Sequence, residues 1–269
     1  MLYRKFGKLD WSVSALGFGA MRLPLVDNNP ANIDVPESIR IIRYAIDHGV
    51  NYVDCAYSYQ LGRSELAVGQ ALRDGYRQKV KLATKLPSWL ADTQEACDRY
   101  LNEQLERLQT DRIDFYLLHA LNARFWPKLR DLGIFNWAER AIADGRIGHL
   151  GFSFHDDFAL FKEIVDAYDR WTLCQIQYNY VDADYQAGTR GLKYAADRGL
   201  AVSIMEPLRG GRLTRRLPEH IAKLMATVQR ERTLAELGLL WVWNHPEVSV
   251  VLSGMTTMKQ VVENVATAG

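Results

Sequence analysis

Residues 80–120 read VKLATKLPSWLADTQEACDRYLNEQLERLQTDRIDFYLLHA, and this stretch shows the pattern that decides the fold. It begins and ends with the short apolar runs Val80–Leu86 and Phe115–Ala120, which are typical of strands buried on both faces of a sheet. Asp92 and Glu95 have the spacing of a capping box, which predicts a helix start between the two runs. One face of that predicted helix is apolar and carries Cys97, Leu101, Leu105 and Leu108.

The same alternation of apolar run and helical pattern continues along the chain. Gly49, Gly145 and Gly199 lie where helices are expected to stop. Eight consecutive strand–helix units indicate a parallel sheet, and eight strands are the number that closes a (β/α)8 TIM barrel. The predicted strands are Ala15–Met21, Tyr52–Ala56, Val80–Leu86, Phe115–Ala120, Ile147–Phe154, Leu173–Asn179, Ala201–Pro207 and Val248–Gly254.

We therefore predict an α/β chain that forms one barrel domain over residues 1–269, with a hairpin over residues 3–13 closing its floor. A doubly wound open sheet is the alternative. That fold would need a phosphate-binding loop at its first turn. Here Gly17-Phe18-Gly19 continues as Ala20-Met21-Arg22, so G-x-G-x-x-G is not completed.

Bulk composition narrows the functional classes. The 33 basic and 32 acidic residues give a net charge of +1, which does not favour nucleic acid or a membrane surface as a partner. No apolar run is long enough for a membrane span, and the first residues lack a signal-peptide core. The three cysteines, Cys55, Cys97 and Cys174, have no metal-ligand spacing, so we expect buried thiols and a cytoplasmic location.

Polar residues follow three consecutive predicted strands. Asp54 lies near the end of the second, Lys85 ends the third and His119 lies at the end of the fourth, while Tyr59 follows Asp54 by five residues. The carboxyl ends of barrel strands form the active-site face, so these side chains should lie close together. Because an unpaired buried charge is costly, Asp54 and Lys85 are expected to pair.

These four groups suit the protonation of an alkoxide. A tyrosine ordinarily ionises near pH 10, and a neighbouring ammonium lowers its pKa by stabilising the phenolate. We therefore expect Lys85 to lower the pKa of Tyr59 by about two to three units, so that it serves as a general acid near neutral pH. Asp54 would keep the lysine charged and oriented. His119 would hydrogen-bond a substrate carbonyl oxygen or relay a proton to it.

The segments Asp54-Cys-Ala-Tyr-Ser-Tyr59, Thr84-Lys85 and Tyr116-Leu-Leu-His119 resemble the catalytic tetrad of the aldo-keto reductases. The resemblance extends from Leu16 to Asn264. It implies an enzyme that reduces a small-molecule carbonyl substrate with NADPH, or with NADH, bound across the barrel mouth. The cofactor-binding positions implied by the family are Gly19, Ala20, Met21, Ser153, Gln175, Met205, Glu206, Pro207, Leu208, Gly211, Gly254, Gln260, Glu263 and Asn264.

Within that set, the resemblance assigns particular roles. Ser153 and Gln175 would hold the nicotinamide carboxamide, Glu206 to Gly211 would fold over the pyrophosphate, and Glu263 with Asn264 would contact the adenine. At least one arginine of a nearby basic cluster is expected to contact phosphate. That cluster comprises Arg209, Arg212, Arg215 and Arg216.

The sequence departs from the family pattern at several positions. Phe154 replaces the usual asparagine after Ser153, and Met205 replaces the aromatic residue that stacks on the nicotinamide. Gly254 and Gln260 replace the basic residues around the 2′-phosphate, for which Lys259 or an arginine from the loop after the seventh strand could compensate. Four segments resemble a bacterial branch whose longer members often carry an iron–sulfur tail: Gly151–His155, Gln175–Asn179, Ile204–Leu208 and Leu252–Met255. This sequence shows no such tail, either because the tail was lost or because the sequence is a shortened form, and we expect no cluster and an open pocket.

Other readings of the same residues remain open. A metal-dependent barrel enzyme would use mixed oxygen and nitrogen ligands, although the charge of Lys85 would repel the cation. A barrel that binds NADPH without turnover and regulates a partner is a further alternative. His155, which follows the fifth strand, is a candidate substrate contact. The candidate metal ligands are Asp54, His119, His155 and Glu206.

Overall fold

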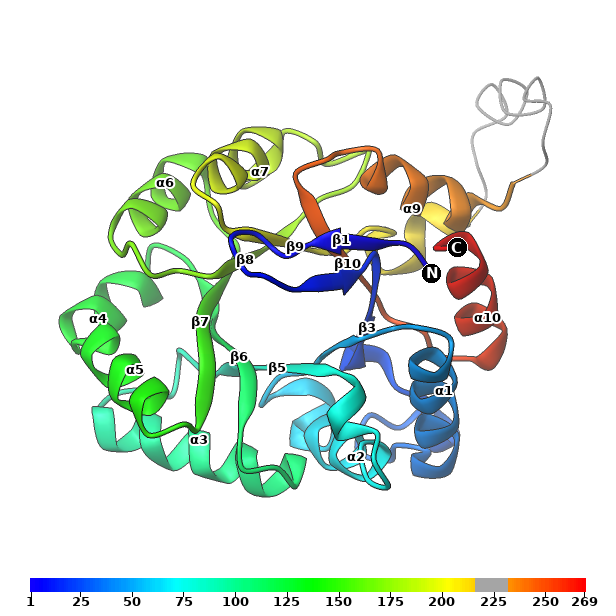
Figure 1. The fold of residues 1–269 in the computed structure, drawn as a ribbon, viewed down its shortest axis with the longest axis horizontal. Helices are drawn as coiled ribbons and strands as arrows, with labels where there is room; N and C mark the ends of the chain where they lie inside the picture. The colour runs from blue at the N-terminus through cyan, green and yellow to red at the C-terminus, as the bar shows by residue number, and fades with distance from the viewer. Residues whose placement is uncertain (216–231) are drawn as a thin grey trace.

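The computed structural model describes residues 1–215 and 232–269. Eight parallel strands form a closed barrel in the order β10-β3-β4-β5-β6-β7-β8-β9 (Figure 1), which confirms the predicted (β/α)8 fold. Neighbours in the barrel are also neighbours in the chain, except where the last strand closes on the first. The strands are β3 (Leu16–Gly19), β4 (Tyr52–Asp54), β5 (Lys81–Leu86), β6 (Ile113–Leu121), β7 (Ile147–Phe154), β8 (Leu173–Gln177), β9 (Ala201–Met205) and β10 (Val248–Ser253).

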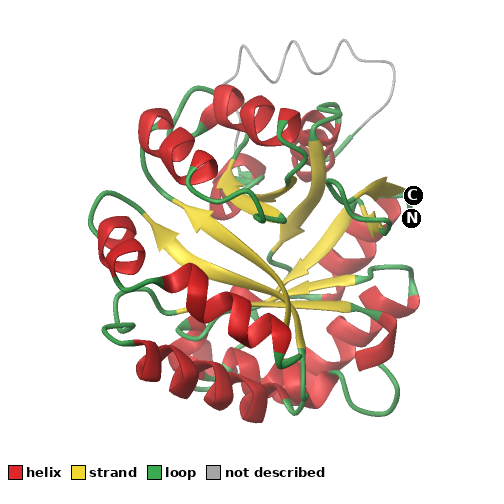
Figure 2. Cartoon of the chain, turned by 60° about the vertical axis from the view of Figure 1, so that its left-hand side comes forward, coloured by secondary structure: helices red, strands yellow, loops and turns green. Residues whose placement is uncertain are grey.

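Helices form a ring outside these strands (Figure 2). Each buries an apolar stripe against the barrel, and two helices rather than one connect β6 to β7. The described helices are α1 (Val35–Asp47), α2 (Ser64–Ala71), α3 (Gln94–Leu108), α4 (Phe125–Asp131), α5 (Ile134–Ala143), α6 (Phe158–Asp166), α7 (Gly188–Asp197), α9 (Leu234–Trp243) and α10 (Met258–Thr267).

Local signals account for the helix ends. Gly49, Gly145 and Gly199 follow α1, α5 and α7 with φ of 98°, 88° and 75°, a backbone region that glycine enters without strain. The predicted cap at Asp92 is wrong by one residue. The side chain of Thr93 accepts the hydrogen bond from the Ala96 amide, so α3 begins after it.

The barrel floor is closed by a short hairpin, as predicted. Strands β1 (Tyr3–Lys5) and β2 (Ser12–Ser14) pair antiparallel and cross the floor in Figure 1. Phe6 packs there against Tyr52 and Phe115, with ring centroids 5.8 and 4.7 Å away. This inner cluster fills the lower barrel, which leaves the opposite end for the site.

Two further predictions concern the chain as a whole. Cys55, Cys97 and Cys174 are free thiols and all three are buried, as expected. Among the described residues, no helix is both long and apolar enough to cross a membrane.

Candidate active site

The centre of the barrel mouth is built around the ammonium group of Lys85. This side chain is fully buried, and its Nζ lies 2.6 Å from Oδ1 of Asp54 and 2.8 Å from the carbonyl oxygen of Cys55. The hydroxyl of Tyr59 lies 3.2 Å from the same nitrogen. An ammonium has three protons to donate, and here three acceptors surround it. The predicted pairing of Asp54 with Lys85 is therefore confirmed.

The hydrogen-bond direction at Tyr59 has a chemical consequence. Lys85 has no lone pair, so the Tyr59 oxygen accepts from it and the phenolic proton must point elsewhere. Tyr59 lines the open cavity at the barrel mouth. Its proton is thus available to a group bound in that cavity.

The backbone around Tyr59 is held in an uncommon conformation. Tyr59 begins the short helix η3 (Tyr59–Gly62), in which Gln60 and Leu61 have φ of 48° and 57°. Positive φ costs free energy in residues other than glycine and is concentrated at functional sites. The side chain of Gln60 secures the turn, because its Nε2 donates to the carbonyl oxygen of Leu23 at 2.9 Å.

His119 is aimed at the site by an irregularity in strand β6. The register between β6 and β7 shifts between Leu118 and Leu121, and Ala120 has φ of 55°. The Ala120 amide donates to Oγ of Ser153 at 2.8 Å, which holds the irregularity in place. The ring of His119 lies edge-on to Tyr59, with centroids 5.9 Å apart.

The protonation states follow from burial and charge. Burial lowers the pKa of His119 well below its usual value, and the charge of Lys85 adds to the effect, so the imidazole is neutral. Its Nδ1 is buried without a hydrogen-bond partner among the described residues. Burial alone would lower the pKa of Lys85, but Asp54, Tyr59 and Cys55 together outweigh burial and the pKa is raised. Burial raises the pKa of Asp54, and the ammonium of Lys85 at 2.6 Å opposes that rise. The ion pair is therefore retained at neutral pH.

The predicted lowering of the Tyr59 pKa is wrong for this structure. Burial raises the pKa of Tyr59 above its ordinary value, and Lys85 offsets that effect only in part. Asp54 adds to the effect of burial, because its negative charge beside Lys85 also raises the pKa of the phenol. Tyr59 is consequently a fully protonated phenol at neutral pH.

The cavity that contains Tyr59 has a volume of about 1160 Å³ and lies at the carboxyl ends of the strands. Thirteen of the fourteen predicted cofactor-binding residues line it. They are Gly19, Met21, Ser153, Gln175, Met205, Glu206, Pro207, Leu208, Gly211, Gly254, Gln260, Glu263 and Asn264.

Two of these residues hold their polar groups in defined positions. Gln175 donates from Nε2 to Oδ2 of Asp54 at 3.1 Å, which leaves its Oε1 to accept a hydrogen bond from a ligand. Ser153 accepts from Ala120, which leaves its hydroxyl proton to be donated. This acceptor and this donor line the same cavity. Such a pair is complementary to a carboxamide group.

Some predicted positions fall outside the cavity. Ala20 is fully buried and lies behind the wall, where its carbonyl oxygen accepts a hydrogen bond from Oγ of Ser64 at 2.8 Å. Its predicted contact with a cofactor is therefore corrected. Arg209 and Arg212 line the cavity, whereas Arg215 does not. Arg216 lies outside the described residues.

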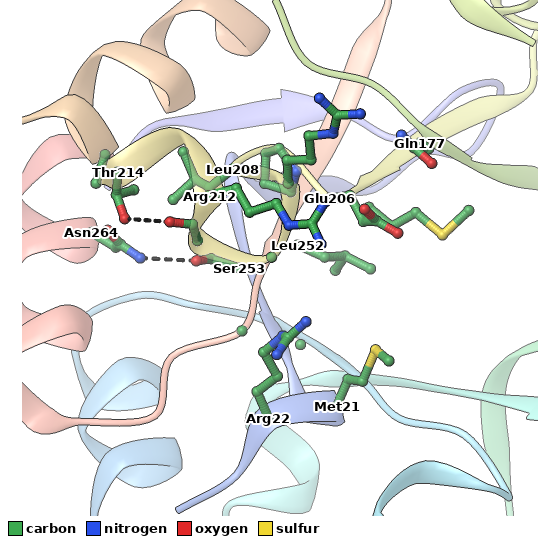
Figure 3. Close-up of a pocket in the computed structure, with 18 of the residues that line it drawn as sticks. Met21, Arg22, Gln177, Glu206, Leu208, Arg212, Thr214, Leu252, Ser253 and Asn264 are labelled. Carbon is green, nitrogen blue, oxygen red and sulfur yellow. Dashed lines mark hydrogen bonds between the residues drawn. The ribbon is translucent and has the colours of Figure 1, made fainter. Parts of the chain in front are cut away.

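Several lining residues were not predicted from the sequence. Arg22 reaches toward the loop after β9 from the opposite side of the cavity, as Figure 3 shows. Its stem packs on Gly254, where a Cβ would lie 3.4 Å from Cδ of Arg22. Gln177 and Asp182 line the same space and hydrogen-bond each other at 3.0 Å. Isolated polar residues of this kind carry no signal in the sequence, because the loops alone bring them together.

The candidate metal ligands are not arranged as a metal site. Across residues 1–215 and 232–269, no three His, Cys, Asp or Glu side chains are grouped to hold an ion. The carboxylate of Asp54 is instead shared by Lys85 and Gln175. His155 and Glu206 both line the cavity, so His155 remains a candidate substrate contact.

Comparisons with known proteins identify a family for this chain. The model of the Aldo/keto reductase family matches residues 15–268. The NADH-specific methylglyoxal reductase of Escherichia coli is 25% identical, over 97% of this chain and 91% of that protein. The holo form of aldo-keto reductase AKR11C1 from Bacillus halodurans has a TM-score of 0.83 at 29% identity, over 99% of this chain and 90% of that one.

An aldo-keto reductase from Klebsiella pneumoniae, solved in complex with NADPH, is similar over 100% of this chain and 90% of its own. Its TM-score is 0.79 and its identity 27%. The family match covers the eight barrel strands and the segments that carry Asp54, Tyr59, Lys85 and His119. This chain belongs to the aldo/keto reductase family of oxidoreductases.

Proposed function

We propose that this protein reduces aldehydes or ketones to alcohols with NADPH, and that Tyr59 is the general acid. The observation that carries the proposal is the hydrogen-bond direction at Lys85. That ammonium donates to the Tyr59 oxygen, so the phenolic proton points away from Lys85 and is free to be donated to a group in the cavity that Tyr59 lines. Membership of the family and the NADPH complex of the Klebsiella protein support the same reading.

The residues of the cavity fit a nicotinamide dinucleotide. A volume of about 1160 Å³ exceeds the few hundred that a small carbonyl compound requires. The acceptor of Gln175 and the donor of Ser153 suit the carboxamide. Arg22, Arg212 and Lys259 line the cavity and provide positive charge for phosphate groups. When bound, the reduced cofactor would supply a hydride to the carbonyl carbon.

The side chains of the chain itself would complete the reduction. Hydride addition places negative charge on the carbonyl oxygen, and Tyr59 would donate its proton to that oxygen. Neutral His119 would hydrogen-bond the same oxygen and orient the carbonyl. Lys85 would stabilise the tyrosinate that remains, because its ammonium already lies 3.2 Å from the phenolic oxygen.

The raised pKa of Tyr59 is compatible with this role. A phenol that stays protonated at neutral pH always has a proton to donate in the direction of reduction. The reverse reaction would require the tyrosinate, whose population falls as the pKa rises. We therefore infer that the site favours reduction of carbonyls over oxidation of alcohols near neutral pH.

The preference for NADPH over NADH rests on positive charge near the adenine end. We propose that Lys259, at the start of α10, contacts the 2′-phosphate in place of the basic residues replaced by Gly254 and Gln260. Lys259 lines the cavity and its side chain is 83% exposed, so it is free to reorient toward a phosphate. Its ion pair with Glu263 is long, at 3.7 Å, and would be exchanged for the phosphate contact.

Turnover with a panel of reactive carbonyl compounds tests the proposal. Loss of NADPH absorbance would be followed for wild type and for Tyr59→Phe, which removes the proton and keeps the ring. We expect turnover by wild type and a loss of at least about a hundredfold in the variant. Quenching of tryptophan fluorescence by NADPH without turnover of any carbonyl would instead favour the regulatory alternative.

A further inference from the structure

A fully buried polar network lies directly behind Lys85, between helices α2 and α3 and strands β5 and β6. Its members, Glu65, Thr84, Gln104 and Tyr116, are each 0% exposed. Oε1 of Glu65 accepts hydrogen bonds from Thr84 Oγ1 and from Gln104 Nε2, both at 2.6 Å. The hydroxyl of Tyr116 donates to Gln104 Oε1 at 2.6 Å. No member of this network lines the cavity.

The network joins the two segments that carry the acid and its lysine. Glu65 is the second residue of α2, which follows the Tyr59 turn directly. Thr84 immediately precedes Lys85 on β5, and Gln104 Nε2 also lies 3.1 Å from the carbonyl oxygen of Lys85. Glu65 therefore ties the Tyr59 segment to the Lys85 strand, while Gln104 holds the backbone of Lys85 itself.

The helices are shaped to bring these groups together. Gly69 lies one helical turn after Glu65, and a Cβ at position 69 would stand 2.5 Å from the carbonyl oxygen of Arg107. Only glycine permits α2 and α3 to approach so closely. Arg107 then places its Nη1 3.3 Å from Oε2 of Glu65, so the buried carboxylate has partners on both oxygens.

Stability alone is a poor explanation for a carboxylate at this place. Burial raises the pKa of Glu65, although the hydrogen bonds from Thr84 and Gln104 and the charge of Arg107 favour its ionised form. Well-packed apolar residues commonly stabilise a fold at least as well as a buried ionic group does. The polar network also fixes the positions of the groups that it joins, because each hydrogen bond holds one atom relative to another.

From this arrangement we infer that Glu65 and Gln104 are positioning residues, which set the separation of the Lys85 ammonium and the Tyr59 hydroxyl. The inference rests on the proposed role of Tyr59 as the acid. A misplacement of about 1 Å in a catalytic group costs roughly a hundredfold in rate. Loss of the network should therefore reduce the chemical step while the cofactor still binds.

The test compares Glu65→Leu with the conservative Glu65→Gln, whose amide oxygen can still accept from Thr84 and Gln104. Asp114→Asn is the matched control. Asp114 is buried, pairs with Arg77 and accepts from the Leu82 amide on the same strand β5, but at the floor of the barrel. Its loss should lower the free energy of unfolding without moving Lys85.

We expect Glu65→Leu to lower kcat by at least about thirtyfold, while the Kd of NADPH stays within about twofold of wild type. With NADPH deuterated at C4, the isotope effect on kcat should be larger for this variant than for wild type. Glu65→Gln should retain kcat within about threefold, and Asp114→Asn should retain it while melting earlier. If Glu65→Leu does not fold, Gln104→Met replaces it with the same expected result. An unchanged kcat in a folded Glu65→Leu or Gln104→Met variant would overturn the inference.

A second readout does not depend on turnover. The ionisation of Tyr59 can be followed as the tyrosinate absorbance that is lost in Tyr59→Phe. Displacing Lys85 removes the charge that stabilises the phenolate, so Glu65→Leu should shift this ionisation to higher pH. An unshifted titration would contradict the inference even if the wild type reduced no carbonyl. Absence of turnover in wild type with a shifted titration would instead contradict only the proposed function.

Discussion

The pair formed by Lys85 and Asp54 makes a quantitative prediction about stability. Both side chains are almost completely buried, 0% and 3% exposed, with 2.6 Å between Nζ and Oδ1. Removing one member leaves an unpaired charge in the barrel. We therefore expect Lys85→Met and Asp54→Leu each to lower the free energy of unfolding by about 3–5 kcal/mol.

The double variant should lose much less free energy of unfolding than the two single variants lose in sum. Additivity of the single effects would give a loss of about 6–10 kcal/mol. With both charges gone, the remaining cost comes from the unpaired amide of Gln175 and carbonyl of Cys55, about 1–3 kcal/mol each. With the middle of each range, a summed loss of about 8 kcal/mol and a remaining cost of about 4 kcal/mol give a coupling of about 4 kcal/mol in a double-mutant cycle.

Urea denaturation followed by far-ultraviolet circular dichroism provides the assay. The four proteins would be compared at neutral pH, where the ion pair is intact. None of the three variants should reduce carbonyl compounds, since each removes Lys85, which donates to Tyr59, or Asp54, which holds Lys85 in place. Losses that add within about 0.5 kcal/mol would refute the reasoning, because they would mean that the two charges do not depend on each other.

Three further predictions follow from the site. Because the pKa of Tyr59 is raised, kcat for reduction should stay level from about pH 7 to 9, and a decline with an apparent pKa near 7 in a pH–rate profile would contradict this. His119 has a depressed pKa, so the folded state excludes a proton that the unfolded chain binds below about pH 6.5. The free energy of unfolding that the neutral form contributes is present above that pH and is lost as pH falls, by up to about 1.4 kcal/mol per pH unit. In thermal melts, the stability of a His119→Asn variant should therefore depend less steeply on pH than that of wild type. Lys259→Ala should weaken NADPH binding about tenfold and leave NADH binding unchanged in fluorescence titrations, whereas equal losses for both cofactors would argue against contact with the 2′-phosphate.

Much of the architecture could be predicted because it is encoded locally. Strands such as Ala201–Met205 are short and nearly all apolar, and the number and order of these strands are sufficient to indicate a closed barrel. The pairing of Asp54 with Lys85 could be predicted for a similar reason. Charges at the ends of adjacent parallel strands lie side by side, and burial makes their pairing obligatory.

The remaining features depend on three-dimensional context. The pKa of Tyr59 is the sum of burial and two opposite charges, and the sequence does not give their relative sizes. Arg22 reaches the site with its stem packed on Gly254, which lies far away in the sequence. Glu65 offered one signal, an acidic residue directly before the apolar residues Leu66 to Val68, but its partner Gln104 lies 39 residues further along.

Transfer of hydride from NADPH to a carbonyl carbon, with Tyr59 as the acid, can be followed with a deuterium label. Wild-type protein would be incubated with a reactive aldehyde and NADPH carrying deuterium at both C4 positions, and the alcohol analysed by mass spectrometry and NMR. The account predicts one deuterium on the carbinol carbon, formed by wild type and nearly absent with Tyr59→Phe. Alcohol without deuterium, or undiminished deuterated alcohol from Tyr59→Phe, would contradict it.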